Sequence, residues 1–404
     1  MPEGYSRSFG CAQDDSLFSS RPGRPYVFLA SRIVPGDNPP AMRCPRLFLF
    51  LLLFLLLPLG SARASEPFFK KGDVIALVGG EDMVVASEYG YLELLLTRAL
   101  PDYHLRFRNL AWEGDTVFEQ RRDLNFPTWE EQLDKIGATV VIAQFGQMES
   151  LRVVAAGPDS GRPAHLPRVG PTPHPGLRKP DGPAVVQARA EFLDAYGKLL
   201  DRLRAGGQRR VIILQPTGFP LGSPAQEEIS KLGMKMGRMG DRNIYMVNSW
   251  QPRPQQPPRD RDGVHRSAAG QAALATRVVD HLLTEYISHG RPRTPDGQPI
   301  PNTEVRGPKL VTLPEGGGPL AAPAEESLRQ LIIAKNRLWF DYWRPQNWAF
   351  LAGDRTAQPS SRDHLDPSKR WFPPEREAFL PLLDAKEKEI DALAQQLAAG
   401  NAGK

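Results

Sequence analysis

The sequence has little cysteine and no long apolar span. Its 404 residues include only two cysteines, Cys11 and Cys44. Both lie within the first 64 residues, a segment that is expected to be removed from the mature chain, as described below. The mature protein is therefore expected to have neither a disulfide nor thiol chemistry. The longest apolar run, Leu47 to Leu57, has eleven residues, fewer than the ~20 that cross a bilayer as a helix. We expect no stable membrane span in the mature chain.

A strong excess of charge of one sign is also missing. The formal net charge is +5, and beyond residue 64 the chain has 44 basic and 42 acidic residues. This balance argues against a nucleic-acid partner. The histidines show no metal-ligand spacing, and neither a phosphate-binding P-loop nor the glycine pattern of dinucleotide folds occurs. The sequence thus predicts no metal and no cofactor, and it leaves the oligomeric state open.

The first 64 residues have the order of an export signal. A short basic stretch precedes the apolar run, and Ala62-Arg63-Ala64 forms a small-x-small cleavage site after it. This order predicts a signal peptide over 42–64, cleavage near Ala64, and a periplasmic or extracellular protein. We interpret residues 1–41 as a spurious or disordered extension, with the true start at residue 42. The alternative is a long uncleaved tail that leaves the apolar run as an anchor.

Short β-branched runs alternate with helical patterns in the mature chain. The predicted strands cover residues 74–78, 105–110, 139–145, 210–214 and 243–247. Helical spacing predicts helices over residues 91–100, 184–203, 226–239 and 268–287. Continuous apolar runs of this length are typical of parallel strands buried on both faces. The pattern predicts a three-layer α/β/α sandwich with a flavodoxin-like, five-stranded parallel sheet, in which ligands meet the carboxyl ends of the strands.

A helical extension follows the predicted α/β domain of residues 65–290. Residues 291–323 are rich in proline and glycine and are interpreted as a linker. The extension, residues 324–404, contains four of the seven tryptophans, with helices predicted over 325–343 and 375–397. Two interpretations of these aromatic side chains stay open. They pack the extension onto the main domain, or they form a stacking surface for a sugar ring at the mouth of the site.

The candidate site residues lie directly after predicted strands. They are Gly80 and Glu81 after the first strand, Gly114 after the second, and Gly146, Gln147 and Glu149 after the third. The sequence Asp262-x-x-His265 precedes the last helix of the domain. A tight turn there would direct both side chains toward one crevice, where the carboxylate can orient the imidazole and stabilise its cation. The alternative role of Asp262 is to cap the helix.

The four segments that contain these residues are those after the first, second and third predicted strands and the Asp262-x-x-His265 segment. In their order and their positions at strand ends, they resemble the four motif blocks of the SGNH/GDSL hydrolases. The resemblance covers roughly residues 70–290. It implies the SGNH hydrolase fold and ester hydrolysis, with His265 and Asp262 as catalytic residues. It also implies an oxyanion hole that includes the amide of Gly114, and it gives oxyanion or substrate-binding roles to Gly80, Gly146, Gln147 and Glu149.

Two positions depart from the pattern of the family. Glu81 stands where the family has its nucleophilic serine, and Met148 stands where it has an oxyanion-hole asparagine. A carboxylate repels a developing oxyanion, and methionine has no N–H to donate. Removal of one such donor typically costs a factor of ~10²–10³ in rate. These changes argue against an efficient serine esterase.

Three outcomes stay open for this site. It is inactive and binds a ligand, or a neighbouring hydroxyl (Ser87 or Ser150) replaces the serine. In the third outcome, Glu81 or Asp82 activates water directly together with His265, because paired groups can divide acid and base roles.

The tail sequence also resembles an extension found on exported SGNH-type proteins of planctomycete-type bacteria. The residues that carry this resemblance lie between Lys335 and Asn347. The density of Arg, Asn and Trp there motivates the hypothesis that Arg344 and Asn347 contribute to the crevice.

The predicted function is an exported SGNH/GDSL-type hydrolase-like protein that acts on ester bonds of a small-molecule or glycan substrate, carbohydrate esters included. The alternative is a catalytically inactive relative that binds a glycan or another envelope ligand. A third class is a structural envelope protein that uses the tryptophan-rich tail for protein contacts.

Overall fold

The structure of the chain is a computed structural model. It describes residues 68–122, 125–151, 182–205, 208–215, 224–236, 244–247, 265–289, 311–346 and 348–402. All of them belong to one compact unit, Arg63–Lys404. The predicted signal peptide, residues 1–41, Asp262 and Asn347 lie outside the described residues. Among the helices that are described, none is long and apolar enough to cross a membrane.

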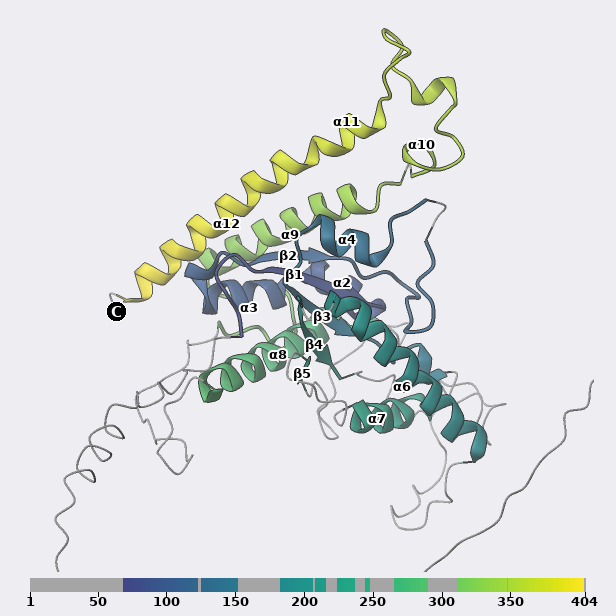
Figure 1. The fold of residues 1–404 in the computed structure, drawn as a ribbon. Helices are drawn as coiled ribbons and strands as arrows, with labels where there is room; N and C mark the ends of the chain where they lie inside the picture. Colours follow the sequence, from purple (N-terminus) through teal and green to yellow (C-terminus); the bar gives the residue numbers. More distant parts are fainter. Residues whose placement is uncertain are drawn as a thin grey trace, which may run out of the picture. The chain divides into compact units, whose positions relative to one another are not determined.

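A five-stranded, all-parallel sheet forms the centre of this unit (Figure 1). Its strands are β1 (Val74–Gly79), β2 (Arg106–Asn109), β3 (Val140–Gln144), β4 (Arg210–Leu214) and β5 (Ile244–Val247). Their order, β2-β1-β3-β4-β5, confirms the predicted flavodoxin-like sheet. Gly79 pairs with Gln144 in the register of β1 and β3, so the carboxyl ends of these central strands are level.

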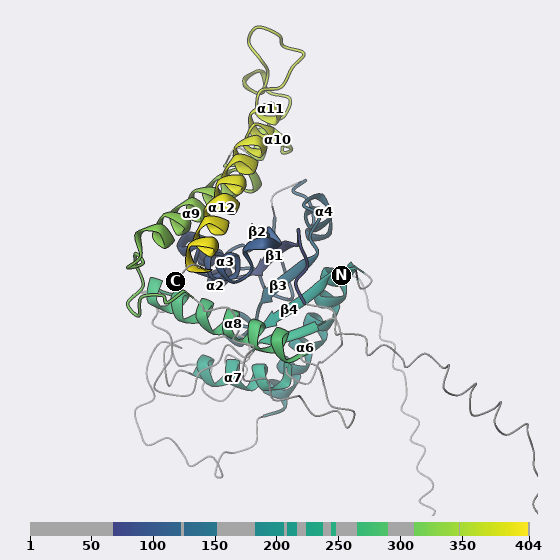
Figure 2. The ribbon, with the colours of Figure 1, turned by 90° about the vertical axis from the view of Figure 1, so that its left-hand side faces the viewer.

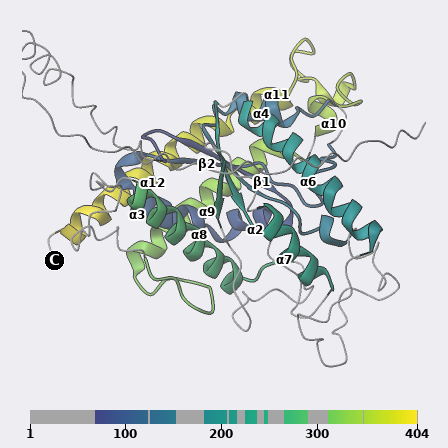
Figure 3. The same ribbon diagram turned by 60° about the horizontal axis from the view of Figure 1, so that its bottom comes forward.

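Helices cover both faces of the sheet and complete the three layers (Figure 2). One face carries α2 (Glu81–Tyr89), α3 (Tyr91–Ala99) and α8 (Ala268–His289), and the other carries α4 (Trp129–Lys135), α6 (Pro183–Arg204) and α7 (Pro224–Met236). Helices α3 and α8 lie side by side (Figure 3). Alternate side chains of β1 supply the two layers, because successive residues of a strand point to opposite faces.

Two short helices, α2 and α4, are not predicted by the spacing of apolar residues. Helix α2 has buried residues on several sides, including its two leading carboxylates, so no single apolar stripe marks it. Helix α4 does carry a local signal. The Thr128 side chain accepts a hydrogen bond from the Glu131 N–H, and the Glu131 carboxylate accepts one from the Thr128 N–H. This reciprocal capping box marks a helix start in the sequence.

The carboxyl-terminal extension covers the β2 edge of the sheet. It contains α9 (Pro323–Trp343), α10 (Trp348–Leu351), α11 (Phe372–Glu377) and α12 (Phe379–Ala402). The helix predicted over 375–397 is therefore interrupted between α11 and α12. Helices α9 and α12 pack side by side (Figure 1), and α9 also contacts β2. A covered edge strand cannot pair with another chain.

Helix α9 takes part in both hydrophobic layers. Leu328 and Ile332 join the cluster on the α3 and α8 face, whereas Trp339 and Trp343 join the cluster on the α4 and α6 face. The indole Nε1 of Trp339 donates a hydrogen bond to the backbone oxygen of Asn109, 2.8 Å away. These two tryptophans therefore pack the extension onto the sheet, which agrees with the interpretation that the aromatic side chains hold the extension on the main domain.

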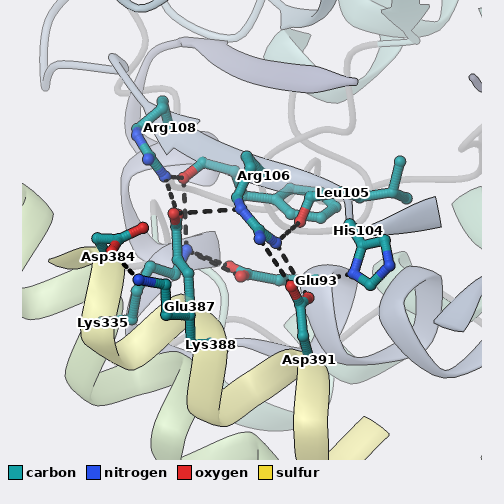
Figure 4. Close-up of polar contacts among 11 residues, drawn as sticks. Glu93, His104, Leu105, Arg106, Arg108, Lys335, Asp384, Glu387, Lys388 and Asp391 are labelled. Carbon is teal, nitrogen blue, oxygen red and sulfur yellow. Dashed lines mark hydrogen bonds and ion pairs between the residues drawn. The ribbon is translucent and has the colours of Figure 1, made fainter. Parts of the chain in front are cut away.

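One buried ion pair and several partly buried ones connect the extension to β2 and α3 (Figure 4). Lys335 of α9 is fully buried, and its Nζ lies 2.8 Å from Oε1 of Glu93 on α3. Burial raises the pKa of Glu93 and lowers the pKa of Lys335, because each charged form loses its hydration. Further pairs join β2 to α12: Arg108 with Glu387 at 2.5 Å and Arg106 with Asp391 at 2.7 Å.

Lys335→Ala should destabilise the fold by about 3–5 kcal/mol, because it leaves the buried carboxylate of Glu93 without its partner. Lys388→Ala is the control. Lys388 pairs with Asp384 at an exposed position of α12, and its loss should cost less than about 1 kcal/mol. The free energy of unfolding in urea measures both effects. Equal stability of the two variants would show that the Glu93–Lys335 pair does not hold the extension in place.

Candidate functional site

The turns after β1, β2 and β3 meet at one edge of the sheet. Glu81 is the first residue of α2, and its Oε1 accepts a hydrogen bond from the Gly114 N–H at 3.1 Å. Glu149 follows β3. Its carboxylate accepts one hydrogen bond from the Val117 N–H at 2.7 Å and another from the Gly146 N–H at 2.9 Å. Two buried glutamates therefore join three turns through backbone amides.

The segment that contains His265 contacts the start of α2 through the next residue, Arg266. Nε of Arg266 donates a hydrogen bond to Oδ2 of Asp82 at 3.0 Å, and both side chains are buried. Asp82 directly follows Glu81, and Arg266 directly follows His265. Glu81 and His265 are therefore each adjacent in sequence to one member of this ion pair. The two partners are 184 positions apart, and no sequence signal predicts their contact. Because Asp262 lies outside the described residues, the Asp262–His265 pair stays a prediction.

Glycine geometry shapes the first two turns. Gly79 has a φ of +147°, and a Cβ there would lie 2.3 Å from the backbone oxygen of Gln144, so only glycine fits. Gly80 precedes α2, and its carbonyl accepts the first hydrogen bonds of that helix. Gly114 has a φ of +79°, a left-handed conformation that favours glycine, and in this conformation its N–H reaches Glu81.

Two buried carboxyl groups near these turns, those of Glu149 and Asp115, have raised pKa values. Burial raises the pKa of Glu149 to about 7, and the nearby charge of Glu81 adds to the effect, while its backbone hydrogen bonds oppose it. Burial also raises the pKa of Asp115, against the opposing ion pair with Arg122. That pair has two 2.7 Å contacts. The sequence analysis did not single out Asp115, although it directly follows Gly114.

Several polar atoms at the strand ends are buried and have no hydrogen-bond partner in the described part of the chain. They include Oε2 of Glu81 and both the oxygen and the nitrogen of the Gln144 amide. Gln144 is the last residue of β3 and is 5% exposed. Each such atom costs about 1–3 kcal/mol when it stays unsatisfied.

The remaining predicted residues lie around these turns. Gln147 is buried, and its carbonyl accepts a hydrogen bond from the Ser150 hydroxyl at 2.7 Å. Arg344 of the extension lies 2.8 Å from the carboxylate of Glu113, and its guanidinium carbon lies 3.8 Å from the ring centre of Trp112. Arg344 thus contacts the turn that ends at Gly114. Within the described ranges, no group of three or more His, Cys, Asp or Glu side chains is placed to hold a metal.

Comparisons with known proteins find similarity only among solved structures. The chain is similar to the lipase Lip_vut3 from a goat rumen metagenome, with 17% identity over 51% of this chain and 95% of that one and a TM-score of 0.37. A gut microbial diltiazem-metabolizing enzyme has 12% identity over 82% and 95% of the two chains and a TM-score of 0.45. A protein described as an SGNH hydrolase from Slackia heliotrinireducens has 14% identity over 52% and 97%, with a TM-score of 0.32.

No protein-family profile matches the chain, and no curated protein matches its sequence. The five-stranded parallel sheet with flanking helices is consistent with the SGNH hydrolase fold that the motif blocks predict. The structural likenesses have TM-scores below 0.5, so they carry no argument about activity. What the site can do is decided by its own residues.

Glu149→Gln should remove a pH dependence of stability. A carboxyl group with a pKa of about 7 in the folded state and about 4.3 in the unfolded state binds an extra proton on folding between these values. Wild-type stability should therefore fall by about 3 kcal/mol, relative to the variant, as pH rises from 4.5 to 8. Urea unfolding of both proteins at pH 5, 6, 7 and 8 measures the difference, and a constant difference would contradict the prediction.

Proposed function

We propose that the chain is an exported SGNH-type hydrolase-like protein whose strand-end site binds a hydroxyl-bearing ligand, such as a glycan, without serine-type ester hydrolysis. Export is inferred from the signal sequence over residues 42–64. The observation that carries the proposal is the hydrogen bond from the Gly114 N–H to the carboxylate of Glu81.

The family resemblance gives the Gly114 N–H a role in the oxyanion hole, where it would donate to the charge that develops on the substrate. In this chain that N–H already donates to Glu81 at 3.1 Å. The Gly114 N–H is therefore already hydrogen-bonded to the Glu81 carboxylate, and the negative charge of that carboxylate would repel an oxyanion in the same place. Glu81 thus removes the nucleophile and occupies part of the hole at once.

Two positions in the turn after β3, residues 146 and 148, do not replace that donor. Met148 has no N–H in its side chain, and the Gly146 N–H donates to Glu149. Loss of a single oxyanion donor typically costs a factor of ~10²–10³ in rate. The combination supports ligand binding over ester hydrolysis as the role of this site.

The unsatisfied atoms at the strand ends indicate the chemistry of the ligand. Oε2 of Glu81 is a buried acceptor, whereas the Gln144 amide has a buried donor and a buried acceptor. Hydroxyl groups both donate and accept hydrogen bonds, so a polyhydroxylated ligand can satisfy all three atoms. An apolar ligand would leave them unsatisfied, at a cost of about 1–3 kcal/mol each.

Hydrolysis of p-nitrophenyl acetate tests the catalytic part of the proposal. Wild-type protein should not exceed the buffer rate, whereas Glu81→Ser combined with Met148→Asn should, because it supplies a hydroxyl and a donor and frees the Gly114 N–H. Addition of His265→Ala to that variant should abolish the gain. Wild-type turnover that disappears in the single variant His265→Ala would instead establish ester hydrolysis.

A glycan array, followed by titration of its hits, tests the binding part. Glu81→Ala and Gln144→Ala should weaken binding by about tenfold or more, since each removes hydrogen bonds in a buried site. Glu119→Ala is the matched control, because Glu119 is an exposed glutamate in the turn after β2. Binding that is indifferent to Glu81→Ala and Gln144→Ala would place the ligand elsewhere.

A further inference from the structure

A pocket lies between the main domain and helix α9, separate from the strand-end site. Its volume is about 370 Å³, which is within the range of small-molecule sites. Helix α2, the residues that follow β2, and α9 each form part of its wall, with the aromatic side chains Trp339, Phe340 and Trp343 all coming from α9. The pocket therefore exists only because the extension is packed on the domain.

The aromatic wall combines buried and accessible rings. Trp339 and Trp343 are almost fully buried, at 3% and 1% exposure, whereas Phe340 is half-buried. The indole N–H of Trp343 is buried and has no hydrogen-bond acceptor in the part of the chain that the structure describes. Phe340 is therefore the accessible ring of this wall, and a ligand with a flat apolar face suits it.

The charges near the pocket are already paired within the chain. Glu113 forms an ion pair with Arg344 at 2.8 Å, and Arg337 forms one with Asp341 at 3.3 Å. The aromatic rings also have cationic partners. Arg337 and Arg344 lie 5.5 Å and 5.2 Å from the ring centre of Phe340. The lining contains two acidic residues, Glu88 and Glu113, and one basic residue, Arg337. A ligand of either sign therefore meets a like charge in the pocket, so the arrangement favours a neutral ligand.

We propose that this pocket binds one neutral pyranose ring, whose apolar face lies against the α9 aromatic side chains and whose hydroxyls contact the polar rim. The rim includes Ser87, Asn109 and Asn336. The amide nitrogens of both asparagines donate hydrogen bonds within the chain, to Met83 and Ser87, so the side-chain oxygens of the rim are the groups that can accept hydrogen bonds from ligand hydroxyls. This site is distinct from the strand-end site, but the two share α2 and the β2 turn. Glu81 begins α2, and Ser87 lines the pocket from the same helix.

Titration with methyl pyranosides of neutral hexoses, followed by saturation-transfer NMR and tryptophan fluorescence, tests this site. Phe340→Ala should weaken the binding of the best pyranoside roughly tenfold, because it removes an aromatic contact. Phe350→Ala is the matched control, because Phe350 is also half-buried in the extension but packs against the ring of Phe372 instead of lining the pocket. It should leave the affinity unchanged.

A second variant, Ile333→Trp, fills the pocket from α9 and should abolish binding while the protein stays folded. Choline and methyl glucuronide serve as cationic and anionic probes, and both should fail to bind. Absence of saturation transfer to every pyranoside, or equal loss in Phe340→Ala and Phe350→Ala, would overturn the proposal. Pyranoside binding that is lost in Glu81→Ala but kept in Phe340→Ala would also overturn it, and would assign the ligand to the strand-end site.

Discussion

The backbone amides after the parallel strands determine which side chains are buried at the strand-end site. A turn that leaves a parallel strand has N–H groups that the sheet cannot satisfy, and buried amides need acceptors. In this chain the acceptors are the carboxylates of Glu81 and Glu149, which receive the N–H groups of Gly114, Val117 and Gly146. The same interaction that would stabilise a substrate oxyanion in a hydrolase is made within the protein.

The use of carboxylates as acceptors for these backbone amides has an electrostatic consequence. Two carboxylates are buried near each other, and the charge of Glu81 contributes to the raised pKa of Glu149. A position at the start of a helix favours a negative charge, which helps Glu81 and Asp82 at the first turn of α2. The ion pair between Asp82 and Arg266 compensates one further buried charge. The edge is thus a set of buried charges that contact amides or an arginine, and Oε2 of Glu81 is one buried oxygen there that receives no hydrogen bond from the described part of the chain.

The strand pattern could be predicted from the sequence, because continuous β-branched runs report burial on both faces of a sheet. The alternation of these runs with helices predicted a doubly wound sheet, and the flavodoxin-like order of its strands was expected together with the family resemblance. The positions of Glu81 and Gly114 followed from their places at strand ends. Their direct contact did not, because the spacing of residues along the chain does not specify which acceptor a particular N–H will find.

Other features had no local signal at all. The pair of Asp82 with Arg266 joins residues 184 positions apart, and the pair of Glu93 with Lys335 joins residues 242 apart. Periodicity shows that a side chain is buried but does not identify its partner. Helix α2 is buried on several sides, so it lacks the amphipathic pattern by which surface helices are predicted.

In the extension, core packing and pocket lining are not alternative roles for an aromatic side chain. Trp339 donates its N–H to the end of β2, is buried in the core, and still lines the pocket beside α2. A side chain that is held by the core presents its ring to a ligand at little cost in conformational entropy. For the same reason, removal of the whole extension could not reveal what the pocket does. It would remove Lys335 together with the aromatic wall and leave Glu93 as an uncompensated buried charge, so the domain would lose stability and the pocket at the same time.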